Sequence, residues 1–131
     1  MKRVLVVDDE PHMLRVLQLF LERAGYSVNT CPNGEAALAA IMKQAPDVMI
    51  TDIQMPKMSG QQLCQALVEQ LPQRRFPIFV MTSMTDQEHR EWTANIENLE
   101  FLEKPLSMRI LSKKLEKYFR EDDGTGAASN A

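Results

Sequence analysis

Two short apolar runs that each end on acidic residues constrain the fold of this chain more than any other feature. Val4–Val7 is followed by Asp8 and Asp9, and Val48–Thr51 is followed by Asp52. Each run is too short for a helix and apolar throughout, which is typical of a strand buried on both faces of a parallel sheet. Because ligand sites in open parallel sheets lie beyond the carboxyl ends of the strands, we expect the three acids to meet at one edge.

A cluster of three carboxylates is unfavourable by itself because the charges repel one another. It becomes tolerable mainly when a divalent cation neutralises it. Mg²⁺ prefers oxygen ligands in octahedral geometry and keeps several waters, so a few carboxylates and a carbonyl group suffice. The residues therefore predict a magnesium site built around Asp8, Asp9 and Asp52.

The rest of the chain alternates between strand and helix patterns. Pro11 suits a first helical turn, Gly25 a helix end, and Ser59 with Gln62 a capping box. We expect the remaining strands at Ser27–Cys31, Phe76–Thr82 and Leu99–Glu103, and helices over 11–24, from Asn33-Gly34 to before Pro46, over 60–71, from the Thr85/Glu88 capping box to Asn98, and from Ser107 to Phe119. Five strands alternating with five helices predict an α/β fold with a parallel sheet covered on both faces, in which the polar strand 27–31 lies at or near an edge.

Composition limits what the chain can be. Its 131 residues fit one ordinary domain, which we place at residues 1–120, with a disordered tail or the start of a linker from 121 to 131. The net charge of -3 gives no electrostatic footprint for nucleic acid, and apolar runs of four to six residues exclude a membrane span. Cys31 and Cys64 lack metal-site spacing and are predicted to be buried, reduced thiols of a cytoplasmic protein.

Two more polar residues fall at predicted strand ends. Thr82 ends the fourth strand and Lys104 follows the fifth. An aspartate can accept a phosphoryl group to form an acyl phosphate, so Asp52 is the natural nucleophile. The transferring group carries charge on three equatorial oxygens, which Mg²⁺, the Lys104 ammonium and the Thr82 hydroxyl with backbone N–H groups can stabilise.

These residues give the chain a specific resemblance over about residues 1–120. Val7 to Glu10, Asp52 followed by Met55-Pro56 and Gly60, Thr82-Ser83 and Lys104-Pro105 together resemble the receiver domain of two-component response regulators. The resemblance implies the chemotaxis-regulator-like, doubly wound (βα)5 fold with strand order 2-1-3-4-5. It also implies a phosphoacceptor switch that takes its phosphoryl group from a histidine kinase, a phosphotransfer protein or a small acyl phosphate.

The resemblance also assigns roles to individual residues. Asp52 is the phosphoacceptor and a metal ligand, Asp9 a direct Mg²⁺ ligand and Asp8 a ligand through water. The Gln54 carbonyl completes the protein ligands, and Mn²⁺ is an alternative metal. Lys104 contacts the phosphoryl group, and Pro105 follows a cis peptide bond in a tight turn.

The switch implied by the resemblance couples Thr82 to an aromatic residue three positions before the lysine, here Phe101. The hydroxyl moves toward the phosphoryl group and the ring fills the vacated space. This reshapes the surface of the fourth helix, fifth strand and fifth helix for an output domain or protein, and it allows phosphorylation-dependent dimerisation. The polar fourth helix fits a mobile element, with Trp92 and Ile96 expected to pack inward.

Some positions depart from the family pattern. The segment 95–100 lacks the usual Gly-Ala pair, so the loop before the fifth strand is expected to differ. Met84 offers no group to orient an attacking water, which favours slow self-dephosphorylation. The last helix lacks the full charge pattern of the DNA-binding subfamily that dimerises through it.

Two other functions stay open beside the switch, in which the chain catalyses only its own phosphorylation and dephosphorylation and is not otherwise an enzyme. One is a scaffold or pseudo-receiver that binds partners without phosphorylation, against which the complete acidic set argues. The other is a Mg²⁺-dependent aspartyl phosphatase. Such enzymes usually carry Asp-x-Asp on one strand, whereas this strand reads Asp52-Ile53-Gln54.

Overall fold

The computed structural model confirms the predicted α/β class and strand order. It describes the backbone of residues 1–83 and 87–129, and the side chains of residues 1–83 and 90–120. The elements are β1 (Arg3–Val7), α1 (Pro11–Arg23), β2 (Ser27–Cys31), α2 (Gly34–Lys43), β3 (Val48–Thr51), α3 (Gly60–Gln70), β4 (Ile78–Thr82), α4 (Gln87–Thr93), β5 (Leu99–Glu103) and α5 (Met108–Ser129). The strands are parallel in the order β2-β1-β3-β4-β5, so the polar strand β2 lies at an edge as predicted.

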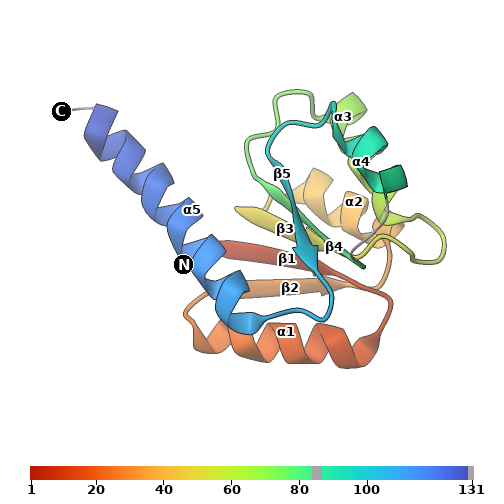
Figure 1. Cartoon of the computed structure of the whole chain (residues 1–131), viewed down its shortest axis with the longest axis horizontal. Helices are drawn as coiled ribbons and strands as arrows, with labels where there is room; N and C mark the ends of the chain where they lie inside the picture. The colour runs from red at the N-terminus through yellow and green to blue at the C-terminus, as the bar shows by residue number, and fades with distance from the viewer. Residues whose placement is uncertain (84–86, 130–131) are drawn as a thin grey trace.

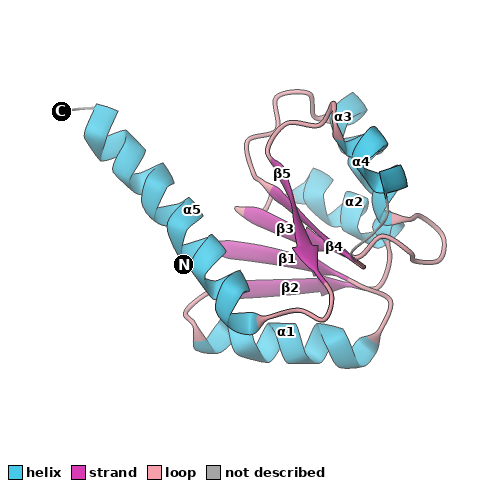
Figure 2. Ribbon diagram, viewed as in Figure 1, coloured by secondary structure: helices cyan, strands magenta, loops and turns pink. Residues whose placement is uncertain are grey.

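Helices cover both faces of the sheet (Figures 1 and 2). On one face α1 and α5 bury Leu17, Leu21, Leu111 and Leu115 against alternate residues of the strands. On the other face α2, α3 and α4 cover the residues that point the opposite way, because neighbouring side chains of a strand alternate between faces. The β1 and β3 side chains are therefore buried on both sides, which explains their continuous apolar sequence.

The predicted signals mark the ends of most helices. The Asn33 side chain accepts from the Ala36 amide at the start of α2, and the Ser59–Gln62 capping box at the start of α3 is complete. Gly25, at φ 100°, follows α1 and has the left-handed conformation that glycine adopts without strain. These local contacts satisfy backbone groups that a helix end leaves without partners.

The fourth helix is shorter than predicted. It ends at Thr93 rather than Asn98, and the Ile96 amide closes a turn onto the Thr93 carbonyl. Asn98 takes φ 58°, a left-handed conformation that asparagine tolerates, and its carbonyl accepts from the Ile78 amide to begin the β5 pairing. The pattern of apolar residues alone would continue the helix to Asn98, but the hydrogen bond to the sheet holds Asn98 in a non-helical conformation. The Thr85/Glu88 capping box and Met84 lie outside the described residues.

Trp92 and Ile96 pack against the apolar cluster under α2 and α3, which confirms the inward orientation predicted for them. Both side chains are only partly buried. The described part of α4 is thus held to the sheet by few apolar contacts.

The last helix continues beyond its predicted end. The sequence predicts a helix to about Phe119 and a disordered tail from Glu121, whereas the backbone of α5 is helical to Ser129 and projects away from the sheet (Figure 1). The residues after 120 contain no proline, and glycine costs a helix only about 1 kcal/mol, so no residue there forces an end. The domain boundary at residue 120 stays a prediction.

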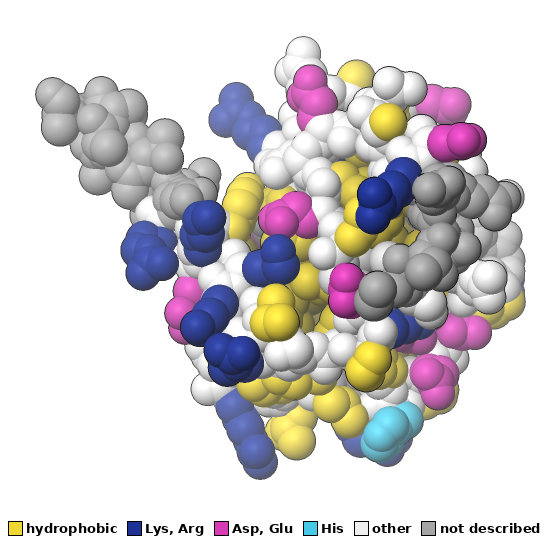
Figure 3. All heavy atoms as spheres, in the orientation of Figure 1, with side chains coloured by type: hydrophobic (Ala, Val, Ile, Leu, Met, Phe, Trp, Pro, Cys, Tyr) yellow, Lys and Arg dark blue, Asp and Glu magenta, His cyan; other side chains and the backbone are white. Residues whose placement is uncertain are grey.

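The surface charge is uneven although the net charge is only -3. Lysine and arginine side chains gather over α5 (Figure 3), where Arg109, Lys113, Lys117 and Arg120 are exposed. No helix among the described residues is both long and apolar enough to cross a membrane.

Both cysteines are buried and free of disulfide bonds, as predicted. Burial raises the pKa of the Cys64 thiol to about 12, although the positive charge of Arg74 acts in the opposite sense. Burial also raises the pKa of Cys31. The two thiols are therefore protonated, apolar core groups at neutral pH.

Adjacent residues of α3 test the core. Leu67 is fully buried, whereas Val68 is 43% exposed on the same helix. We expect Leu67→Ala to lower the free energy of unfolding by about 2–5 kcal/mol because it leaves a cavity, and Val68→Ala to change it by less than about 1 kcal/mol. Urea denaturation followed by circular dichroism measures both, and equal losses would contradict the packing described here.

Candidate functional site

Acidic residues from two neighbouring strands meet at the carboxyl edge of the sheet. Asp8 and Asp9 follow β1 and Asp52 follows β3, and these strands pair in register from Val4↔Val48 to Val7↔Thr51. The Asp52 amide extends this pairing by donating to the Val7 carbonyl over 2.9 Å. One carboxylate oxygen from each acid lies within 4.8 Å of the others, which is the juxtaposition that the sequence predicts.

The three acids differ in exposure. Asp8 is 2% exposed, Asp52 is half-buried and Asp9 is exposed. The Glu10 amide donates to Asp8 Oδ1 over 2.9 Å and so fixes the buried carboxylate.

Burial raises the pKa of the Asp8 carboxyl above its ordinary value, and the negative charges of Asp52 and Asp9 raise it further. The Glu10 amide and the Lys104 charge act in the opposite sense. The net effect is that the ionised form of Asp8 is disfavoured at this position.

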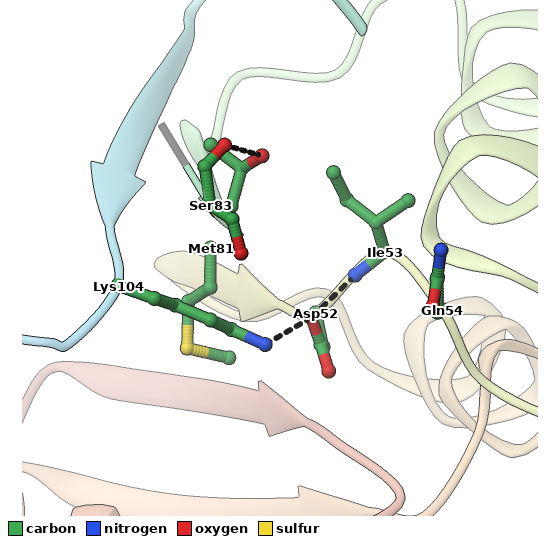
Figure 4. A pocket seen from close by; sticks show the side chains of 7 residues that line it. Asp52, Ile53, Gln54, Met81, Ser83 and Lys104 are labelled. Atoms are coloured by element: carbon green, nitrogen blue, oxygen red, sulfur yellow. Dashed lines mark hydrogen bonds and ion pairs between the residues drawn. The ribbon is translucent and has the colours of Figure 1, made fainter. Parts of the chain in front are cut away.

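The two carboxylate oxygens of Asp52 differ in the hydrogen bonds that they accept from the described residues. Oδ1 accepts from Lys104 Nζ at 2.9 Å and from the Ile53 amide at 2.8 Å (Figure 4). No hydrogen bond among the described residues reaches Oδ2. A charged ammonium and a backbone amide, both donating to one oxygen, fix the direction of the carboxylate and leave the lone pairs of the other oxygen for a reacting group.

Lys104 extends its side chain to Asp52 from the end of the edge strand β5, across β4. It follows β5, and its amide donates to the Thr82 carbonyl over 2.8 Å, which ties the strand ends of β4 and β5 together. The Lys104–Pro105 peptide bond is cis, as predicted. The Lys104 side chain is 38% exposed, so its ion pair with Asp52 is screened by water.

A cavity of about 210 Å³ opens beside this ion pair. It is lined by Asp52, Ile53, Gln54, Met81, Thr82, Ser83 and Lys104. The Thr82 hydroxyl donates to the Ser83 carbonyl over 3.0 Å and is half-buried in this wall. Gln54 lies in the same wall, and its carbonyl as a metal ligand stays a prediction.

The loop after Asp52 depends on a glycine. The Gly60 amide donates to the Ile53 carbonyl over 2.7 Å, and a Cβ atom on Gly60 would lie 2.1 Å from the Asp52 carbonyl oxygen. Only glycine allows the start of α3 to approach the backbone of Asp52 so closely. The sequence marks Gly60 as part of the family pattern, and the structure supplies this physical reason.

Phe101 lies farther from the acids, as a strand-five residue. It pairs with Val80 in register, and Glu103 pairs with Thr82. Because paired residues of parallel strands point to the same face and alternate residues share a face, Phe101 and Thr82 lie on one face of the sheet. Phe101 is half-buried against the apolar cluster on that face, and its role as a switch stays a prediction.

Sequence reasoning missed two parts of the site. The Ile53 amide that bonds Asp52 is a backbone group, so its residue type carries no signal. Met81 lines the cavity although it reads in the sequence as an ordinary buried strand residue. Met81 could not be identified without the placement of β4 beside β3, and the Ile53 amide could not be identified without the direction in which the Asp52 side chain turns.

The residues present fit a small divalent cation. Three carboxylates from two strand tips converge, and the one that is almost fully buried has a raised pKa, so their combined negative charge lacks sufficient compensation from Lys104 alone. Oxygen donors of this kind suit Mg²⁺, which keeps part of its water shell. Asp8, Asp9 and Asp52 could hold such an ion.

The sequence of this chain is similar to those of known proteins. A family model described as Response regulator receiver domain matches residues 4–116. The Bacillus subtilis alkaline phosphatase synthesis transcriptional regulatory protein PhoP is 31% identical over 122 residues, which cover 93% of this chain and 50% of that protein. This chain therefore spans about half the length of that relative.

Solved structures show the same fold. Chemotaxis protein CheY4 of Vibrio cholerae is 32% identical, with a TM-score of 0.81 over 89% of this chain and 98% of that chain. Response regulator protein TrrA of Thermotoga maritima, solved in complex with Mg(2+)-BeF, is 30% identical, with a TM-score of 0.77 over 89% and 98% of the two chains. The acidic cluster of this chain therefore lies in the same fold as a protein that was solved in complex with Mg(2+)-BeF.

Removal of the Asp8 charge tests the cluster. Because the pKa of Asp8 is raised in the folded protein, its protonated form favours folding, and this contribution is lost as the pH rises through the folded-state pKa. At pH 7 without metal we expect Asp8→Asn to raise the free energy of unfolding by about 0.5–2 kcal/mol. Excess MgCl₂ should stabilise the wild type much more than this variant.

Urea denaturation with and without MgCl₂ measures both effects. Glu69→Gln, which neutralises an exposed acid on α3, is the matched control and should behave like the wild type. Equal stabilisation by MgCl₂ of the wild type and Asp8→Asn would argue against a cation site at these acids.

Proposed function

Because the chain belongs to the response regulator receiver domain family, we propose that it is a phosphoacceptor switch of a two-component system in which Asp52 takes the phosphoryl group. The donor is the phosphohistidine of a sensor kinase or of a phosphotransfer protein, in a cytoplasmic pathway. One observation carries the proposal: Asp52 has one oxygen fixed by Lys104 and Ile53, while its other oxygen has no hydrogen bond among the described residues.

The transfer is a displacement at phosphorus. Asp52 Oδ2 forms a bond to phosphorus while the bond between phosphorus and the donor nitrogen breaks, and the donor imidazole leaves with the electron pair. Lys104 Nζ lies where it can balance charge on the transferred group. The Thr82 hydroxyl, now bonded to the Ser83 carbonyl, can turn to donate to a second phosphoryl oxygen.

Asp8, Asp9 and Asp52, with the Gln54 carbonyl, would hold the metal. Mg²⁺, or Mn²⁺ in its place, would supply positive charge that offsets both the acids and the phosphoryl oxygens. Asp8 and Asp9 would then act by fixing the ion in position rather than by touching the phosphoryl group. The cluster of carboxylate oxygens within 4.8 Å supports this assignment.

Receiver domains are signalling switches rather than general catalysts. We therefore propose that the chain catalyses only the phosphorylation and dephosphorylation of Asp52. The residues that follow β3 read Asp52-Ile53-Gln54, with no second acid beside the nucleophile, which agrees with a long-lived acyl phosphate. Met84, whose side chain offers no group to orient an attacking water, lies outside the described residues.

Output would pass through α4, β5 and α5. Thr82 and Phe101 lie on the same face of the sheet. Movement of the Thr82 hydroxyl toward the phosphoryl group would therefore leave a space that the Phe101 ring could enter. The few apolar contacts made by the described part of α4 support a change at this surface. An output domain or a separate protein, and dimerisation on phosphorylation, are the readouts that we propose; direct nucleic-acid binding by this chain is not among them.

Phosphorylation by a small donor tests the proposal. We expect acetyl phosphate with MgCl₂ to add one phosphoryl group to the wild type, detected by intact mass, because Asp52 and the acids form a complete site. Asp52→Ala should show no adduct, and chelation of Mg²⁺ should abolish the adduct of the wild type.

The alternatives give different results. A folded protein that binds Mg²⁺ and gains no phosphoryl group from acetyl phosphate or from a histidine kinase would be a scaffold. Steady release of inorganic phosphate with turnover would identify a phosphatase. Either result would overturn the proposed switch.

Two lysines with similar ion pairs separate the role of Lys104 from a general charge effect. Lys104 Nζ lies 2.9 Å from Asp52, and Lys114 Nζ lies 3.0 Å from Glu100, with comparable exposure of 38% and 34%. We expect Lys104→Ala to slow adduct formation about 100-fold, since it removes a fixed positive donor from the reacting oxygens. Lys114→Ala should leave the rate within about twofold, and equal rates for both variants would remove Lys104 from the mechanism.

A further inference from the structure

An apolar groove lies at the opposite end of the sheet from Asp52. It has a volume of about 560 Å³ and is formed where the chain enters β3 and β4. Its lining consists of Ala45, Pro46, Gln70, Leu71, Pro72, Gln73, Arg74, Arg75 and Phe76. The volume falls within the range of about 300–1,000 Å³ typical of small-molecule sites, which are mostly apolar with a few placed polar groups.

The charge of the groove has one sign. Its lining contains two arginines and no acidic residue, in a chain whose net charge is -3. Arg75 is exposed at the rim, and its guanidinium makes no hydrogen bond or ion pair with the described residues. Asp47, which lines an adjoining hollow together with Arg75, accepts a hydrogen bond from the Arg3 amide over 2.7 Å. A free guanidinium beside apolar walls is complementary to an anion with an apolar body.

The groove wall is held in place from both sides. The Arg74 guanidinium donates to the carbonyls of Phe76 and Glu97, which ties the loop before β4 to the loop before β5. The Arg75 carbonyl accepts from Asn98 Nδ2 at 3.1 Å and from the Tyr118 hydroxyl at 3.4 Å. A ligand would therefore meet a wall that is already ordered, which reduces the entropy cost of binding.

We propose that this groove binds a small apolar anion, an alkyl or aryl carboxylate, with its apolar body on Pro46, Leu71 and Phe76 and its carboxylate on the guanidinium of Arg75. A second copy of the chain fits less well, because the groove joins an apolar surface to positive charge and offers no acid to pair with the arginines of a partner copy. The site lies away from the acidic cluster and does not depend on phosphorylation of Asp52.

Titration with a matched pair of probes tests this site. The probes are 4-phenylbutyrate and its uncharged amide, each added to unphosphorylated ¹⁵N-labelled protein and followed by amide chemical shifts. We expect saturable shifts at residues 45–47 and 70–76 with a Kd of about 1 mM or tighter. The carboxylate should bind about threefold to fivefold more tightly than the amide, as expected for a partly exposed ion pair.

Two variants assign the preference to one side chain. Arg75→Gln removes the charge and keeps the backbone carbonyl that Asn98 and Tyr118 contact, so it should fold and lose the preference for the carboxylate. Arg23→Gln, which removes an exposed charge from α1, should bind both probes like the wild type.

Four results would overturn the proposal. The first three are an absence of saturable shifts, equal affinity of the wild type for the two probes, and an undiminished preference in Arg75→Gln. A fourth is the same set of shifts on concentrating the protein without a probe, which would show that a second copy covers the groove.

Discussion

Repulsion among Asp8, Asp9 and Asp52 is the constraint on which the rest of the structure depends. Carboxylates whose oxygens lie within 4.8 Å of one another would separate if their backbone could move. They stay together because each follows a strand in the centre of the sheet, and those strands are buried on both faces. Burial of the apolar core thus offsets the electrostatic cost at the strand tips. The excess negative charge that remains there attracts a cation.

Lys104 relieves only part of that repulsion. It bonds one oxygen of one acid from a side chain that is 38% exposed, and Asp8 lies almost fully buried behind it. The arrangement therefore leaves a need for a second cation while fixing the direction of the Asp52 carboxylate. Gly60 contributes to the same fixed direction, because its lack of a side chain lets α3 begin directly against the Asp52 carbonyl.

The sequence predicted most of the fold and the members of the site because both follow from local rules. Apolar runs that end on acids identified β1 and β3, and Asn33 and Ser59 marked helix starts through side-chain caps that depend on residues three positions apart. The end of α4 was wrong because it is decided by a distant contact, the bond between the Asn98 carbonyl and the Ile78 amide. Met81 was missed because the placement of neighbouring strands decides what an apolar side chain lines, and the Ile53 amide was missed because a backbone group carries no signal of residue type.

The two ends of the sheet are stiffened to different degrees, and this difference has a mechanical consequence. At the amino end of β4 and β5, Arg74 and Asn98 cross-link the incoming loops through carbonyl groups. At the carboxyl end the described residues are tied by a hydrogen bond from the Lys104 amide to the Thr82 carbonyl and by the partly exposed Lys104–Asp52 ion pair, and the described part of α4 beside them has few apolar contacts. A change of charge at Asp52 would therefore move the backbone near Thr82 and along α4, where few contacts oppose the movement. The amino ends of β4 and β5 would stay in place, because Arg74 and Asn98 hold them.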